Sequence, residues 1–234
     1  MKILALDSSG MVASVAIMED DILIGEYTIN YKKTHSQTLL PMLDEVVKMT
    51  ETNLEEIDAI AIAKGPGSFT GLRIGSATAK GLGLALNKPI IPVPTVDALA
   101  YNLFHTQAYI CPIIDARRNN VYTGLYYWND ATFEVIEPQC ARSIEETIDA
   151  VNAFESPVIF LGDGVPVFKN IILEKIQVPV SFAPAHVNRQ RAGAVGSLAL
   201  QYYEQGIVEK AADHAPDYLK KSQAERERDA KNAH

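Results

Sequence analysis

The sequence predicts an α/β fold built twice, in which two halves of similar plan each form a mixed sheet covered by helices. Each half opens with an apolar strand that stops at an aspartate, LALD ending at Asp7 and PIID ending at Asp115. Each aspartate is followed by a turn and a second strand, and the chain then alternates strands with helices. This order is typical of sheets that carry helices on their faces.

The first half is expected to begin with an antiparallel meander, because two tight turns separate three strands. Thr34 and Gln37 fit a capping box at the start of a helix in which Pro41 predicts a kink or a late start. Thr95 is expected to cap a shorter helix. The predicted strands span 3–6, 12–18, 22–31, 59–63 and 89–93, and the predicted helices 34–49, 68–87 (or from 70) and 96–104.

The second half repeats this plan. Ser143 and Glu146 predict a capping box. The predicted strands span 110–114, 121–128, 132–141, 157–161 and 180–182, and the predicted helices 143–154, 167–175 and 188–205. We expect an N-terminal subdomain (1–106) carrying the partner interface, a C-terminal subdomain (107–222) and a loose charged tail (223–234). Two such halves with a cleft between them are typical of the duplicated actin–hexokinase–Hsp70 fold, which is RNase H-like.

The most unusual stretch is a Gly-Pro-Gly turn that leads from an apolar strand into a glycine-rich helix. Gly71, Gly75, Ala79 and Gly83 recur every fourth residue and therefore share one helix face. Each glycine in a helix interior costs about 1 kcal/mol relative to alanine, so close approach of a neighbouring backbone is expected to compensate. That neighbour is either the sheet of the same domain or a second protein chain, and the spacing leaves both open.

Composition excludes several classes of protein. The chain has 234 residues, of which 47% are apolar and 21% charged, which is typical of globular proteins with ample core. Its net charge of −8 disfavours direct RNA binding by this chain alone. Cys111 and Cys140 form no C-x-x-C pair and are expected to be inert buried thiols. We expect a cytoplasmic protein without a membrane span, since no run of 18 apolar residues occurs.

The strand-end aspartates are weak candidates for cofactor binding. Asp7 and Asp115 are expected to face each other across the cleft, where paired carboxylates can position a metal–nucleotide complex. Ser8 and Ser9 are placed to donate hydrogen bonds to a phosphate. The alternative is that both aspartates only cap the turns that follow their strands.

Other catalytic patterns fail. The Gly65-Pro66-Gly67 turn matches neither phosphate-binding glycine motif, and Pro66 offers no N–H group to an anion. No two of the five histidines are spaced for a helical metal pair, and His35 is expected to be a helix cap or an interface group. Ser68 lacks the glycines of a nucleophile elbow. The DARR turn at 115–118 binds an anion or forms a surface ion pair.

Several segments together carry a resemblance to a known family. Over nearly its whole length the chain resembles the bacterial TsaB (YeaZ) family, with GPGSFTGLR and DARR as the most specific matches. The matching segments are ILALDSS (3–9), THSQTLLP (34–41), GPGSFTGLRIG (65–75), DARRNNVY (115–122), GDG (162–164) and PDYLK (216–220).

The resemblance implies the actin-like fold and a role in making N6-threonylcarbamoyladenosine beside the tRNA anticodon, in tRNAs that read codons beginning with A. It implies a non-catalytic subunit that works with a metal-binding catalytic subunit, TsaD, and an ATPase, TsaE. Catalytic relatives carry two histidines where Thr95 and Leu99 stand here, so no metal or catalytic residue is expected. No intrinsic cofactor is expected, ATP or ADP binds in the complex, and tRNA is contacted only indirectly.

The resemblance also implies that the glycine-rich helix and the helix at 34–49 pair with a second copy or with the catalytic subunit. Homodimer and heterodimer would then compete, and a bulky residue at Gly75 would weaken both. The alternatives are a free-standing nucleotide-binding protein, homodimeric or kinase-like, and a peptidase-like enzyme of the same superfamily. The expected interface residues are His35, Leu39, Leu40, Leu43, Ser68, Phe69, Leu72, Arg73, Gly75, Ser76 and Ala79.

Overall fold

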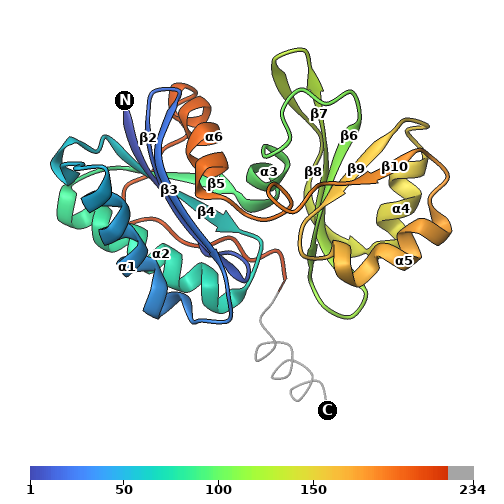
Figure 1. Ribbon diagram of the computed structural model, residues 1–234, viewed down its shortest axis with the longest axis horizontal. Coiled ribbons are helices and arrows are strands. Elements are labelled where there is room, and N and C mark those ends of the chain that lie inside the picture. Colours follow the sequence, from blue (N-terminus) through green and yellow to red (C-terminus); the bar gives the residue numbers. More distant parts are fainter. Residues whose placement is uncertain (221–234) are drawn as a thin grey trace.

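The structure, a computed structural model, describes residues 1–220, which form two α/β halves lying side by side (Figure 1). Within this range each half contains one five-stranded sheet. The elements of the first half are β1 (Lys2–Asp7), β2 (Val12–Glu19), β3 (Ile22–Asn30), α1 (His35–Met49), the short helix Leu54–Glu56, β4 (Ala59–Gly65), α2 (Phe69–Leu86), β5 (Ile90–Pro94) and α3 (Thr95–Ala100).

The second half supplies the remaining strands and two helices, after which the chain crosses back. Its elements are β6 (Tyr109–Asp115), β7 (Asn120–Asn129), β8 (Thr132–Ser143), α4 (Ile144–Asn152), β9 (Val158–Leu161), α5 (Val165–Lys175) and β10 (Val180–Phe182), followed by α6 (Ala192–Glu204).

The two sheets have the same strand order and the same directions. The first runs β3-β2-β1-β4-β5 and the second β8-β7-β6-β9-β10. In each sheet the three strands of the meander pair antiparallel, and the next two strands add in parallel. The predicted duplicated actin-like α/β fold is therefore confirmed at the level of topology.

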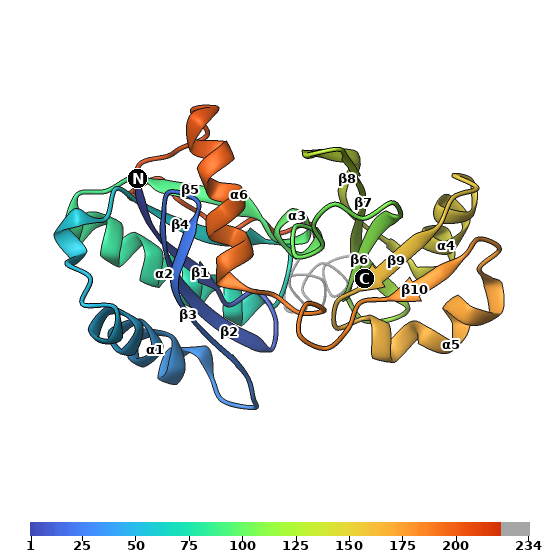
Figure 2. The same cartoon turned by 45° about the horizontal axis from the view of Figure 1, so that its top comes forward.

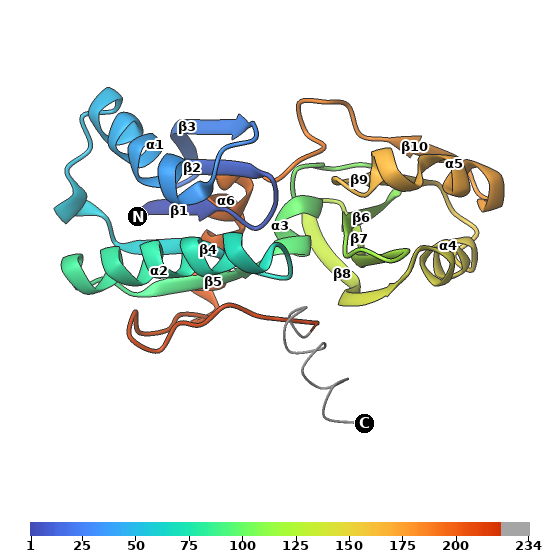
Figure 3. The same ribbon diagram turned by 90° about the horizontal axis from the view of Figure 1, so that it is seen from below.

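Helices cover both faces of the first sheet (Figure 3). On one face α1 and α2 pack together and enclose Leu39, Leu43 and Ala79 with the strand residues Leu4 and Ile62. On the other face α6 packs on β1 and β2. Among residues 1–220, no helix combines the length and apolarity that a membrane crossing requires.

The return of α6 changes the expected division of the chain. The helix was expected within a C-terminal subdomain spanning 107–222, but it lies against the first sheet, beside β2 (Figure 2). Its buried residues Val195, Leu198 and Ala199 belong to the same apolar cluster as Ile3 and Ala5 of β1. Helix α6 and the segment after it therefore return to the first half, and at the end of that segment Lys220 Nζ also lies 5.8 Å from the Tyr122 ring of the second half. The predicted tail from 223 lies outside the described residues.

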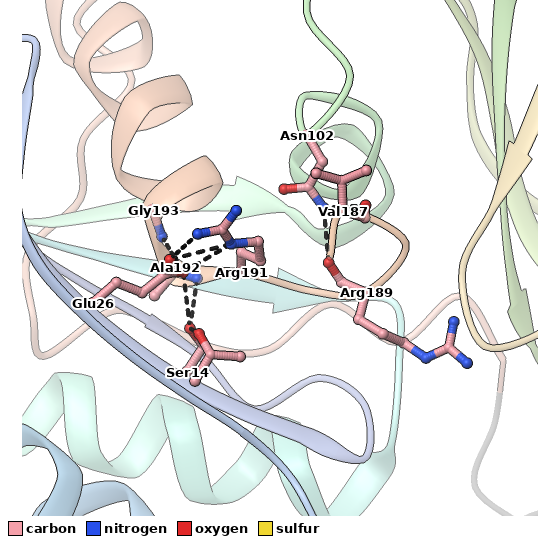
Figure 4. A network of polar contacts seen from close by, with 9 residues as sticks. Ser14, Glu26, Asn102, Val187, Arg189, Arg191, Ala192 and Gly193 are labelled. Atoms are coloured by element: carbon pink, nitrogen blue, oxygen red, sulfur yellow. Dashed lines mark hydrogen bonds and ion pairs between the residues drawn. The ribbon is translucent and has the colours of Figure 1, made fainter. Parts of the chain in front are cut away.

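Side chains from β2 and β3 hold the start of α6. Its N-cap residue, Arg191, gives no side-chain cap. Instead Ser14 Oγ accepts from Ala192 N at 2.8 Å and Glu26 Oε1 accepts from Gly193 N at 3.2 Å (Figure 4). Glu26 also pairs with the Arg191 guanidinium. A carboxylate at a helix N-terminus is favourable, so the first half supplies the cap that the local sequence lacks.

The short helix α3 joins the two halves. It packs against β4 and β5 of the first half and against β6 and β7 of the second. Its buried Asp97 accepts hydrogen bonds from Tyr126 on β7 at 2.7 Å and from Tyr202 on α6 at 3.1 Å. Burial raises the pKa of Asp97, and the two phenol groups partly offset that rise. This carboxylate therefore links three elements drawn from both halves.

Several predicted helix ends differ from the structure. Thr34 is the N-cap of α1, but its side chain makes no capping bond, and the helix continues through the exposed Pro41. Thr95 is the first residue of α3 rather than its cap, and its hydroxyl accepts from Gly65 N at 3.0 Å. The capping box of Ser143 and Glu146 forms as predicted. Of the two predicted starts of α2, position 68 is the observed one, and the Ser68 side chain caps the helix by accepting from Gly71 N.

Candidate functional site

A cavity of about 470 Å³ lies between the halves, where the turns after the central strands meet. Its walls come from the turn after β1, the Pro66–Phe69 segment, the turn after β6 and a segment near the C-terminus. In sheets with parallel strands, ligands commonly bind beyond the carboxyl ends of the strands. The position is therefore the one predicted for a cleft site. The polar lining residues include Ser9, Ser68, Asp115, Arg117, Tyr122, Asp163 and Asp217.

The first candidate aspartate, Asp7, forms its hydrogen bonds within the turn that follows β1. Asp7 is 1% exposed, and its Oδ1 accepts from Ser9 N at 2.8 Å and Ser9 Oγ at 2.7 Å. Burial raises the pKa of Asp7 to about 6. Ser8 Oγ donates to Gly71 O at 2.9 Å. The groups expected to hold a phosphate are therefore hydrogen-bonded within the protein.

The second candidate aspartate makes the same turn. Asp115 Oδ1 accepts from Arg117 N at 2.8 Å, two residues on, as Asp7 does from Ser9. Unlike Asp7 it lines the cavity, and its other oxygen pairs with the Arg117 guanidinium at 3.1 Å. Asp163 fixes it further by accepting from Asp115 N at 2.9 Å. This geometry agrees with the alternative prediction, in which both aspartates cap the turns that follow their strands.

The glycine-rich face of α2 points into the first half. A Cβ added at Gly71 would lie 2.0 Å from Ser8 O, and one at Gly75 would lie 2.3 Å from Ser8 Oγ. Ala79 is fully buried in the core of the first sheet. Of the two neighbours that the spacing left open, the one observed is therefore the same domain, because β1 and its turn occupy the space that these small residues leave.

Some of the residues expected at the partner interface are buried, and others are exposed to solvent. Leu39, Leu43, Leu72, Gly75, Ser76 and Ala79 are buried. Leu40, Ser68 and Arg73 are exposed, while His35 and Phe69 are half-buried. His35 Nε2 lies 2.8 Å from Gly10 O and so donates, which ties the start of α1 to the turn after β1.

The outward face of the two helices includes residues that the sequence reasoning missed. Leu40 on α1 is 54% exposed and Leu84 on α2 is 61% exposed. Arg73, Ala77 and Gly81, which precede Leu84 along α2, are also exposed, and open space surrounds Gly81. We call this set of five residues the docking surface. The four residues on α2 are also spaced for one helix face, but the glycine pattern pointed to the opposite face of α2.

A segment after α6, residues 209–220, runs back along α2 to the cavity, and we call it the C-terminal strap. Glu209 and Ile90 exchange two backbone hydrogen bonds of 2.9 Å. The buried His214 lies 2.5 Å from Glu209 Oε1 and 3.0 Å from Ser76 Oγ. Lys80 Nζ donates to two strap carbonyls, at 2.8 and 2.9 Å. The strap had been signalled only by the PDYLK segment.

The Ser76–His214–Glu209 series has the order of a hydrolase triad but not its setting. Ser76 is 4% exposed and His214 2% exposed, so a substrate has no access to the hydroxyl. Ser76 also lies inside α2, where main-chain N–H groups are used by the helix and cannot form an oxyanion hole. The geometry attaches the strap to α2.

The positions matched to the two histidines of catalytic relatives are occupied by side chains that make structural contacts. Thr95 and Leu99 lie on α3, and both are buried. The Thr95 hydroxyl is bonded to the turn at Gly65, and Leu99 packs in the apolar cluster with Tyr126. Within residues 1–220, no group of three or more His, Cys, Asp or Glu side chains is placed to hold a metal ion.

Comparison with known proteins gives the family. A family model described as TsaD, tRNA N6-adenosine threonylcarbamoyltransferase, matches residues 23–228. The tRNA threonylcarbamoyladenosine biosynthesis protein TsaB of Bacillus subtilis (strain 168) is 33% identical, and the alignment covers 96% of each chain. The chain belongs to the TsaB (YeaZ) family. The resemblance carried by the GPGSFTGLR and DARR segments is thereby confirmed.

Solved structures agree with this assignment. YeaZ from Pseudomonas aeruginosa superimposes with a TM-score of 0.80 at 28% identity, over 93% of this chain and 99% of that one. A second structure, described as an uncharacterized protein with similarity to peptidase YEAZ from the same organism, has a TM-score of 0.79 at 27% identity, over 94% and 99%. The tRNA N6-adenosine threonylcarbamoyltransferase of Protochlamydia amoebophila is 32% identical, over 51% of this chain and 36% of its own.

Proposed function

We propose that the chain takes part in forming threonylcarbamoyladenosine in tRNA as a non-catalytic subunit that binds and supports a TsaD-family catalytic subunit. The observation that carries this proposal is the chemistry of α3. Thr95 and Leu99 replace the two histidines of catalytic relatives, and neither side chain ligates a metal as imidazole does. The family membership and the shared fold support a subunit that keeps the scaffold of a catalytic relative without its ligands.

The partner is expected to bind the docking surface on α1 and α2. Exposed leucines at Leu40 and Leu84 offer apolar area, and the small residues Ala77 and Gly81 admit a close helix. A second copy of the chain is the competing occupant of this surface. TsaE joins as a third protein, ATP or ADP binds in the complex, and tRNA is held through the partner, all in the cytoplasm.

Light scattering coupled to size-exclusion chromatography tests this proposal. The chain alone should elute as a homodimer, and an equimolar mixture with the TsaD-family subunit of the same organism should elute as a one-to-one heterodimer. Leu40→Asp should weaken both assemblies at least tenfold, because it places a charge in an apolar contact.

Val167→Asp is the matched control, since Val167 on α5 is 58% exposed and lies in the other half of the molecule. This variant should assemble as the wild type does. A wild-type chain that does not bind the TsaD-family subunit would contradict the proposed scaffold role. Normal assembly of Leu40→Asp with both partners would show that the docking surface is wrongly placed.

The alternative is an enzyme that works alone. The Ser76–His214–Glu209 series and the cavity between the halves are the observations that favour it. Purified chain should hydrolyse neither ATP nor a casein substrate, and Ser76→Ala should not alter any background rate. Turnover that disappears in Ser76→Ala would establish a peptidase, and ATP turnover would revive a nucleotide-dependent enzyme.

A further inference from the structure

We propose that the tip of the C-terminal strap, residues 217–220, covers one end of the docking surface and is displaced when the TsaD-family subunit binds. The inference rests on the proposed function, since it concerns the same surface and the same partner. It is argued from how differently the two ends of the strap are attached to the rest of the protein. One end is bound deeply to the first half, and the other is held by exposed side chains beside the docking surface.

The deep end forms an anchor. Glu209 pairs with the buried β5 residue Ile90, and the side chain of His214 is fully buried between Glu209 and Ser76. A Cβ added at Gly83 on α2 would lie 2.7 Å from Ala211 Cβ, so α2 leaves room for the strap at this position. The anchor is therefore part of the folded first half and is expected to stay in place.

The tip is held mainly by side chains at the surface. The ring of Tyr218 lies 4.7 Å from that of Phe69, and its hydroxyl accepts from Arg73 Nε at 3.2 Å. The Arg73 guanidinium in turn lies 4.0 Å over the Phe69 ring. One backbone bond, from Asp217 N to Lys64 O at 2.7 Å, secures the tip to the strand end.

These contacts occupy the cavity end of α2. Arg73 belongs to the docking surface, and Phe69 lies one helical turn before it, so Tyr218 holds the groups that a partner would meet first. Tyr218 and Leu219 are themselves 38% and 37% exposed. Exposed hydrogen bonds and ring contacts are weak, so a partner that offers equivalent contacts can replace them.

Calorimetric titration of the full-length chain with the TsaD-family subunit tests the inference. Tyr218→Ala should raise the affinity about threefold to tenfold, because the variant no longer has to release the tip. Tyr203→Ala is the matched control, since Tyr203 on α6 has a similar exposure of 40% and lies away from α2. Its affinity should equal that of the wild type.

Hydrogen exchange of the wild-type chain gives a readout that needs no variant. Saturation with the TsaD-family subunit should speed exchange at the Asp217 amide and leave the Glu209 amide protected. Unchanged or weaker binding by Tyr218→Ala, or a slower Asp217 amide in the complex, would overturn the strap inference and leave the proposed function standing. Absence of binding by wild type and variant alike would overturn both.

Discussion

Asp7 carries the least favourable charge in the first half. The carboxylate is fully buried after β1, and its hydrogen bonds from Ser9 only partly compensate for the loss of water. Burial raises its pKa from 3.8 to about 6, which corresponds to about 3 kcal/mol between its protonated and ionised forms. The residue is therefore ionised at neutral pH at the expense of folding stability.

This gives a prediction with a defined sign. Because the folded-state pKa of Asp7 lies above the unfolded value, stability falls as pH rises from about 4 to about 6. Asp7→Asn keeps an oxygen that accepts from Ser9 and removes the titration. The difference in unfolding free energy, wild type minus variant, should fall by about 2 kcal/mol between pH 4 and pH 7. Urea denaturation at several pH values measures it, and a constant difference would contradict the assignment.

The two cysteines show how burial controls reactivity at the residue scale. Burial raises the pKa of the Cys111 thiol to about 12 and, less strongly, that of the half-buried Cys140. Thiolate is the reactive form, so both groups are poor nucleophiles at neutral pH. The prediction of a buried thiol is confirmed for Cys111 and holds only in part for Cys140, and the inertness of both thiols stays a prediction.

At the scale of the element, α2 uses its glycines for packing inside the first half. The inward glycines bring the helix against the turn at Ser8, whereas Gly81 faces open space. Glycines on two faces of the same helix therefore have different environments. Only the inward positions need the absence of a side chain.

The two positions give a paired prediction. Gly75→Ala should destabilise the fold by about 1–3 kcal/mol, because its Cβ would meet Ser8 Oγ in a packed core. Gly81→Ala should be neutral or stabilise by about 0.5–1 kcal/mol, since alanine favours the helix and nothing obstructs it. Thermal denaturation distinguishes them, and equal effects at both positions would refute the inward packing.

Helix α6 depends on a cap supplied from another element. Glu26 on β3 accepts from Gly193 N and pairs with Arg191, and its side chain is 8% exposed. Glu26→Ala should destabilise the protein by about 2–4 kcal/mol, because it leaves helix donors and a guanidinium without their acceptor. Glu45→Ala, at an exposed site on α1, is the control and should change stability little. Urea midpoints of the two variants measure the contrast, and similar values would argue against the cap.

At the scale of the whole molecule, α3 packs against both halves and connects them. Tyr126 is fully buried in the second half, and its hydroxyl donates to Asp97 beside the first half. Tyr101 on the α3 side contacts the rings of Trp128 and Phe133. The two halves are therefore joined through α3, and the tip of the strap lines the cavity between them.

Tyr126→Phe tests this coupling. The change removes a donor to a buried carboxylate and should cost about 1–3 kcal/mol. Both halves should still unfold in one calorimetric transition, at a lower temperature than in the wild type. Tyr127→Phe, on the same strand but with no bond to Asp97, is the control. Two separate transitions in the wild type would show that the halves are independent.

The sequence by itself determined the duplicated plan and the family. Local sequence patterns predict the strands that end at Asp7 and Asp115, the turns after them and the cap at Ser68. They can do so because backbone conformation at these positions depends on neighbouring residues. Only the tertiary structure decided which face of α2 the glycines use and that α6 and Tyr218 return to the first half. Both the packing face of α2 and the return of the chain depend on which distant part of the fold leaves room for them. The spacing of residues along the sequence does not indicate where that room is.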